Sequence, residues 1–126
     1  MSTPKEKSEA LIAIVDDDQS FREALQTLLT LIGFRTAIFA SARDFLDSPQ
    51  FPGVSCAILD ISMPGMDGLE LQQHLAATRP MPIIFITDLR DAKTREQAVR
   101  SGAVSFLNKP VSEKSLLEAL SSALPA

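Results

Sequence analysis

Short apolar runs alternate along the chain with longer amphipathic segments. The apolar runs cover residues 11–15, 34–39, 54–59, 82–87 and 103–107, and we expect each of them to form a β-strand. The first, third and fourth runs lack the alternation of a half-exposed strand, which is typical of parallel strands covered on both faces. The pattern therefore requires helices on both sides of one sheet.

The amphipathic segments predict five helices. The first has an apolar stripe from Phe21 to Ile32, and Gly33 is placed to end it in a left-handed cap. Three more are expected over residues 42–47, 69–77 and 92–101, and the last carries the apolar residues Leu116, Leu117, Leu120, Ala123 and Leu124. Strand and helix in regular alternation indicate the α/β class. We adopt a flavodoxin-like, doubly wound, five-stranded parallel sheet in the order 2-1-3-4-5, one of two common orders, with five helices.

Composition limits the domain count and the environment. The chain has 126 residues, 45% of them hydrophobic, which suits one domain. We expect residues 1–9 to be a flexible tail and residues 10–126 to be the folded domain. Cys56 is the sole cysteine and no apolar run reaches the length of a membrane span, so we expect a cytoplasmic protein without a membrane partner. The net charge of -4 argues against nucleic acid binding by this chain alone.

Polar side chains gather where the predicted strands end. In an open parallel sheet, ligands bind outside the carboxyl ends of the strands, at the point where the strand order reverses. Three aspartates follow the first strand, and one follows the third. A threonine ends the fourth strand, and a lysine comes just after the fifth. These residues are Asp16, Asp17, Asp18, Asp60, Thr87 and Lys109, and the topology places all of them at one edge.

Helix capping is the simplest alternative for the aspartates, because a carboxylate before a helix accepts hydrogen bonds from free backbone N–H groups. Asp18 can cap the first helix, and Asp67 is better placed than Asp60 to cap the third. Asp16, Asp17 and Asp60 are then unexplained, and three like charges together need a cation. Hard oxygen ligands suit Mg²⁺, with Mn²⁺ as a second choice.

Lys109 and Thr87 complete a plausible phosphoryl-transfer site. Taken alone, a lysine at a strand end is usually solvated, and a threonine in a strand is usually ordinary filling. Beside Asp60 and a metal, however, they supply the positive charge and the hydroxyl donor that a transferring phosphoryl group requires. The coincidence of these groups at one edge outweighs the separate alternatives.

The motifs IVDDD, ILDISMPGMDGLEL, IIFIT and GAVSFLNKP occur in this order. Together they resemble the receiver domain of bacterial two-component response regulators, nearest to the FixJ type. The resemblance covers nearly the whole chain, from Leu11 to Leu124. It is specific in combination, whereas a pair of aspartates or a lone Lys-Pro would be weak.

The resemblance implies roles for individual residues. Asp60 would be the phosphoacceptor, and the backbone carbonyl of Ser62 would join Asp16, Asp17 and Asp60 as a Mg²⁺ ligand. Thr87 would donate its hydroxyl to the phosphoryl group, and Lys109 would pair with a phosphoryl oxygen. The Lys109–Pro110 peptide bond would be cis. Thr87 and Phe106 would form the conformational switch, although plain core packing explains Phe106 equally well.

One position departs from the family pattern. Asp88 follows Thr87 where the family usually has a small residue, so it is a candidate modulator of phosphorylation. It could instead cap the fourth helix, a role for which Asp91 competes. The sole histidine, His74, has polar neighbours on the third helix and is interpreted as a surface residue.

We therefore interpret the chain as a signalling module rather than an enzyme, one that promotes its own phosphotransfer and autodephosphorylation. Its partners would be a histidine kinase or phosphotransfer protein, and a second copy or an effector bound through the fourth helix, fifth strand and fifth helix. The basic fourth helix is interpreted as a solvated face. The alternatives are an aspartyl-phosphate phosphatase or phosphotransferase of the haloacid dehalogenase type, and the receiver half of a DNA-binding regulator.

Overall fold

Five parallel strands and five α-helices alternate in the computed structural model, which describes residues 9–124. The strands are β1 (Leu11–Val15), β2 (Arg35–Phe39), β3 (Cys56–Leu59), β4 (Ile83–Thr87) and β5 (Ser105–Asn108). The helices are α1 (Gln19–Leu31), α2 (Ala42–Leu46), α3 (Gly68–Thr78), α4 (Ala92–Arg100) and α5 (Glu113–Ala123). The sheet order β2-β1-β3-β4-β5 confirms the predicted flavodoxin-like topology. The tail expected over residues 1–9 lies almost wholly outside the described residues and stays a prediction.

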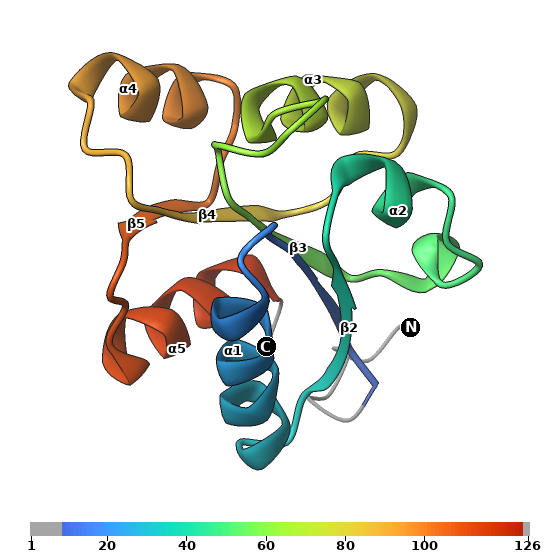
Figure 1. The fold of residues 1–126 in the computed structure, drawn as a ribbon. Helices are drawn as coiled ribbons and strands as arrows, with labels where there is room; N and C mark the ends of the chain where they lie inside the picture. Colours follow the sequence, from blue (N-terminus) through green and yellow to red (C-terminus); the bar gives the residue numbers. More distant parts are fainter. Residues whose placement is uncertain (1–8, 125–126) are drawn as a thin grey trace, which may run out of the picture.

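Helices cover both faces of the sheet, as the apolar strands require. Helices α1 and α5 lie on one face, and α2, α3 and α4 lie on the other (Figure 1). Along β1, Ile12 and Ile14 pack toward the first face, while Ala13 and Val15 pack toward the second. All five residues of β1 and of β4 are buried, which explains why these runs show no polar alternation.

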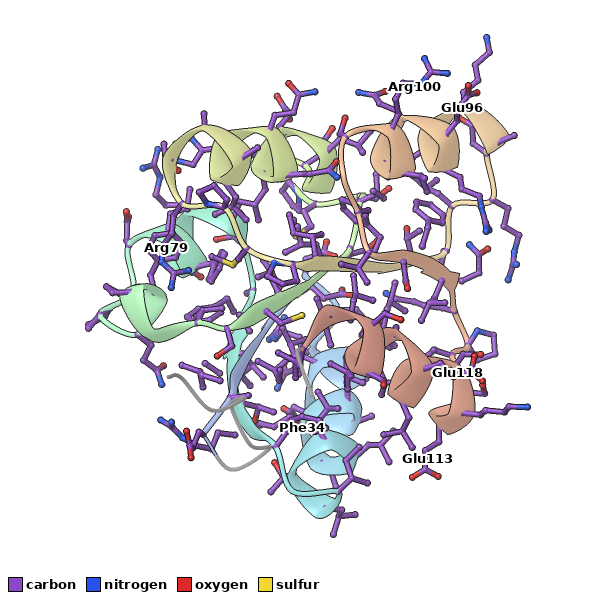
Figure 2. All side chains as sticks on the ribbon, turned by 180° about the vertical axis from the view of Figure 1, so that it is seen from behind. Phe34, Arg79, Glu96, Arg100, Glu113 and Glu118 are labelled. Carbon is purple, nitrogen blue, oxygen red and sulfur yellow. The ribbon has the colours of Figure 1, made fainter. Side chains whose placement is uncertain are left out.

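Element boundaries differ from the predicted ones by one or two residues. Strand β3 begins two residues later than expected, and a short 3-10 helix, η1 (Phe51–Gly53), which ends at Val54, precedes it. Arg79 fixes η1 to the end of α3, because its guanidinium donates to the carbonyl oxygens of Pro52 and Val54 at 2.8 and 2.9 Å. Figure 2 shows the Arg79 side chain reaching across to this loop. Nothing in the local pattern predicted this contact.

Aspartates begin three of the helices. The Asp18 side chain accepts from the backbone N–H of Phe21 at 3.2 Å, and Asp67 forms a capping box with Glu70 at the start of α3. Both caps were expected. The α4 cap is Asp91, which accepts from Lys93 N–H at 3.1 Å and from the Thr94 hydroxyl at 2.9 Å, and these bonds lower the pKa of Asp91. The capping role considered for Asp88 is therefore wrong.

Two further features concern membrane-spanning helices and the single thiol. Within residues 9–124 no helix combines the length and apolarity needed to span a membrane. The Cys56 thiol is buried in β3, and this burial raises its pKa to about 12, so the thiol is protonated and shielded near neutral pH.

Candidate functional site

Three carboxylates meet at the carboxyl end of the sheet. Asp16, Asp17 and Asp60 each place one oxygen within 4.8 Å of the other two. The parallel register causes this meeting, because Val15 at the end of β1 pairs with Leu59 at the end of β3. Asp16 and Asp60 are buried and Asp17 is exposed. The predicted acidic cluster is thus present.

Lys109 brings one positive charge into this cluster. Its Nζ lies 2.9 Å from Asp16 Oδ2 and 3.4 Å from Asp60 Oδ2, with 11% of the side chain exposed. Desolvation alone would lower the pKa of Lys109, but pairing with Asp16 and Asp60 outweighs it and the net shift is upward. Burial raises the pKa of Asp16, and hydrogen bonds from Lys109 and from Asp18 N–H partly offset that effect. One ammonium beside three carboxylates leaves a surplus of negative charge.

Oxygen lone pairs remain for a hard cation. Asp16 Oδ1 accepts from Asp18 N–H at 2.8 Å, and Asp16 Oδ2 pairs with the Lys109 ammonium at 2.9 Å, so each of these oxygens keeps a further lone pair. Asp60 Oδ1 accepts from Ile61 N–H at 2.7 Å. An all-oxygen donor set with more negative charge than its one ammonium neutralises fits Mg²⁺ or Mn²⁺ better than a softer metal.

A glycine lets the loop after β3 pack tightly beneath Asp60. Gly68 N–H donates to Ile61 O at 2.8 Å, closing the segment between β3 and α3. A Cβ at Gly68 would lie only 2.1 Å from the carbonyl oxygen of Asp60, so no other residue fits without a backbone shift. Gly68 therefore belongs to the framework that positions the Asp60 carboxylate.

The ends of β4 and β5 are joined by a hydrogen-bond network. Asn108 Nδ2 donates to the carbonyl oxygens of Thr87 and Leu89 at 3.1 and 2.7 Å, and Arg90 donates to Lys109 O at 2.8 Å. These bonds fix the backbone on either side of Lys109, and the Lys109–Pro110 bond is cis, as expected. Sequence reasoning assigned no structural role to Asn108 or Arg90, although Asn108 directly precedes the lysine.

Thr87 and Phe106 both lie in the interior. Thr87 is fully buried, and its Oγ1 accepts from Leu89 N–H at 3.2 Å. Phe106 packs with its ring centroid 6.0 Å from that of Phe85, and the Arg95 guanidinium lies 5.9 Å from its centroid. The buried ring agrees with the core-packing alternative and is also one of the two positions that a switch requires.

An open cleft of about 620 Å³ adjoins the carboxylates. Its walls come from the loops after β1, β3 and β4 and from the beginning of α4, and include Asp17, Ser62, Asp67, Leu89 and Thr94. Asp88 is exposed at the start of the β4–α4 loop. His74 is exposed on α3, as predicted.

The chain belongs to the response regulator receiver domain family, because the model of that family matches residues 12–121. Response regulator protein TmoT of Ectopseudomonas mendocina is 42% identical over 117 residues, which are 92% of this chain and 53% of TmoT. Transcriptional regulatory protein FixJ of Bradyrhizobium diazoefficiens is 38% identical over 116 residues, which are 90% of this chain and 56% of FixJ.

Solved structures agree with this assignment. The response regulator StyR superimposes with a TM-score of 0.83 at 41% identity, covering 92% of this chain and 59% of StyR. The structure titled FixJ-N gives a TM-score of 0.80 at 33% identity, covering 90% of this chain and 92% of that one. The FixJ-like resemblance is confirmed, and the haloacid dehalogenase alternative gains no support. The chain spans about half the length of the curated relatives it matches.

Proposed function

We propose that this receiver domain takes a phosphoryl group onto Asp60 from a histidine kinase or a phosphotransfer protein. The observation that carries the proposal is the Asp60 carboxylate, whose Oδ2 lies 3.4 Å from Lys109 Nζ beside two further carboxylates. An Asp60 oxygen attacks phosphorus, the bond to the donor breaks, and an aspartyl phosphate forms. The test is the intact mass of the protein after incubation with acetyl phosphate and Mg²⁺.

Two side chains would stabilise the charge of the transferred group. Lys109 already faces Asp60 and needs only a small movement to pair with a phosphoryl oxygen. Thr87 would exchange the hydrogen bond that it accepts from Leu89 for one that its hydroxyl donates to the phosphoryl group. Because the new contact favours one conformation of the β4–α4 loop, phosphorylation shifts the population, with Phe106 as the second switch residue.

Mg²⁺, or Mn²⁺ in its place, would be held by the carboxylates of Asp16, Asp17 and Asp60 and by the backbone carbonyl of Ser62. The acidic cluster, with three carboxylates beside one ammonium, supports this assignment. When bound, the cation supplies positive charge to the phosphoryl oxygens.

The same geometry supports a module that promotes its own phosphorylation and dephosphorylation without a separate substrate. A second copy or an effector would bind through α4, β5 and α5, where Val99 is 52% exposed. The basic residues Lys93, Arg95 and Arg100 of α4 are all exposed, which agrees with a solvated face. The Arg95 guanidinium lies over the Phe106 ring, and Arg100 pairs on the surface with Glu96, one helical turn away (Figure 2). We propose residues 10–126 as the domain boundary and the cytoplasm as the location, which the buried free thiol supports.

Replacing Asp17 by asparagine should weaken Mg²⁺ binding at least about tenfold, because one full charge near a dication is lost. Within residues 9–124 no basic side chain forms an ion pair with the exposed Asp17 carboxylate. Asp16, in contrast, is already paired with Lys109. Titration calorimetry of the unphosphorylated protein measures the change.

Asp18→Asn is the matched control, because it removes a charge from the adjacent position. Asparagine also caps helices, so this variant should keep its Mg²⁺ affinity and lose about 1 kcal/mol of stability or less. Equal affinities in the Asp17 and Asp18 variants would remove Asp17 from the metal site.

Replacing Asp88 by alanine should speed phosphorylation by acetyl phosphate at least about threefold at low salt. Asp88 is exposed, does not cap α4 and directly follows Thr87. A carboxylate about 7 Å from an incoming phosphoryl group repels each unit of its charge by about 0.6 kcal/mol in water. Rates measured across ionic strengths should converge as salt screens this repulsion.

Asp88→Glu keeps the charge and should retain the parent rate. Indistinguishable rates for the alanine variant and the parent at every salt concentration would show that Asp88 has no influence on the site.

A further inference from the structure

The Lys109 ammonium has a third contact that the roles described above do not use. Its Nζ lies 4.3 Å from the centroid of the Phe21 ring, in addition to its ion pairs with Asp16 and Asp60. This distance is well within the range of a cation–π interaction, in which the negative face of an aromatic ring attracts a cation. Phe21 is half-buried in the first turn of α1. Side chains from α1 and from the residues that follow β1 and β3 therefore converge on one ammonium group.

We propose that Phe21 is a positioning residue for phosphotransfer, with its ring holding the Lys109 ammonium beside Asp60. The inference rests on the proposed phosphorylation of Asp60 and adds a residue that the sequence analysis placed only in the apolar stripe of α1.

A ring suits this task better than another carboxylate would. The lysine side chain has a flexible four-carbon stem, and its ion pair with Asp16 at 2.9 Å is shorter than that with Asp60 at 3.4 Å. An additional carboxylate would cancel the charge that the phosphoryl oxygens need. The uncharged ring attracts the ammonium, excludes water from it, and accepts no strong hydrogen bond. The donors and the positive charge of Lys109 therefore remain available to the phosphoryl group.

A hydrogen bond at the start of α1 fixes the backbone that carries the Phe21 ring. The Asp18 side chain accepts from Phe21 N–H at 3.2 Å, which fixes the first turn of α1 immediately after the acidic pair. Phe21 also lines an apolar groove of about 210 Å³, together with Ala24, Leu25, Leu28, Pro110 and Val111. The residues after Lys109 thus meet α1 at the same ring. A purely structural role in this groove is the competing account, and it requires only apolar volume at position 21.

A series of fluorinated phenylalanines at position 21 separates the two accounts. Each added fluorine weakens the negative face of the ring while nearly preserving its shape. The rate constant for phosphorylation by acetyl phosphate with Mg²⁺ should fall stepwise from phenylalanine to trifluorophenylalanine, by about fivefold in total. Phe21→Leu should slow the reaction to a similar degree, and Phe21→Tyr should retain the parent rate. A constant rate across the series, in proteins of equal thermal stability, overturns the proposal.

Leu28→Ala is the matched control, since Leu28 lines the same groove, whereas the ring and carboxylate partners of Lys109 among the described residues are Phe21, Asp16 and Asp60. It should lower thermal stability and leave the phosphorylation rate within about twofold of the parent. A rate loss equal to that of Phe21→Leu would assign the effect to groove packing and overturn the positioning role.

A measurement without metal or phosphoryl donor tests the contact itself. In the parent protein, ring currents should shift the NMR signals of the Lys109 ε-methylene upfield, and Phe21→Leu should abolish this shift. An absent shift overturns the proposal whatever the rates show. A parent protein that gains no phosphoryl group overturns the proposed function together with the positioning role, whereas a phosphorylated parent with a flat fluorination series overturns the positioning role alone.

Discussion

The Asp60→Asn protein is expected to gain no phosphoryl group from acetyl phosphate and Mg²⁺, whereas the parent protein gains one. An amide oxygen carries no full negative charge and cannot form the acyl phosphate, so the reaction loses its nucleophile. The substitution preserves the shape of the side chain, and the new amide oxygen can still accept from Ile61 N–H as Asp60 Oδ1 does at 2.7 Å. Intact mass spectrometry measures the outcome directly.

Asp67→Asn provides the control for this experiment. Asp67 lines the cleft that adjoins the carboxylates and caps α3, and asparagine is an equally good cap, so the variant should fold and gain one phosphoryl group. Persistent phosphorylation of the Asp60→Asn protein would move the acceptor to another residue. Omitting Mg²⁺ or adding EDTA should prevent phosphorylation of both the parent and the Asp67 variant.

Gly68→Ala is expected to lower the free energy of unfolding by about 2 kcal/mol or more, because overpacking against rigid backbone forces a main-chain shift. The added Cβ would lie 2.1 Å from the carbonyl oxygen of Asp60 and 2.9 Å from the Ile61 Cα. The shift falls on the residues that position the acceptor, so phosphorylation should slow as well. Urea denaturation gives the change in stability.

Gly53→Ala is the matched glycine substitution. It lies in η1, where a Cβ meets nothing within 4 Å, and its backbone does not require positive φ. Its stability should stay within about 0.5 kcal/mol of the parent. If both variants lost the same stability, the close approach of Gly68 to Asp60 would not be the cause.

The strands and their order could be predicted because both depend on regular patterns. Buried parallel strands need uninterrupted apolar residues, and the alternation of strands with helices leaves few topologies. The local details depended on contacts distant in sequence. The segment before β3 forms η1 and is held by Arg79, which comes more than 20 residues later in the sequence, at the end of α3. The sequence could not decide between Asp88 and Asp91 as the cap, because both lie just before α4. The backbone conformation decides for Asp91.

The candidate site likewise has residues that the sequence predicted and one that it did not. Asp16, Asp17, Asp60 and Lys109 were expected together because each lies within two residues of the end of a strand, so the sheet order alone brings them to one edge. The contact of Phe21 with Lys109 depends on the direction of two side chains from α1 and from the residue after β5. A phenylalanine in an apolar helical stripe gives no signal that distinguishes it from ordinary core. The sequence therefore predicted the charged groups of the site but not the aromatic ring beside them.

The sparse packing of α4 has a consequence for hydrogen exchange. Helix α5 buries Leu116, Ala119, Leu120 and Ala123, whereas α4 buries Ala98 alone. Its other deep attachment is the hydrogen bond of 2.9 Å from Gln72 Nε2 to Ala98 O. Detaching α4 exposes little apolar surface, so its amides exchange through a local opening that costs far less than global unfolding. Helix α4, which contributes Thr94 to the cleft, should therefore detach at a smaller cost in free energy than α5.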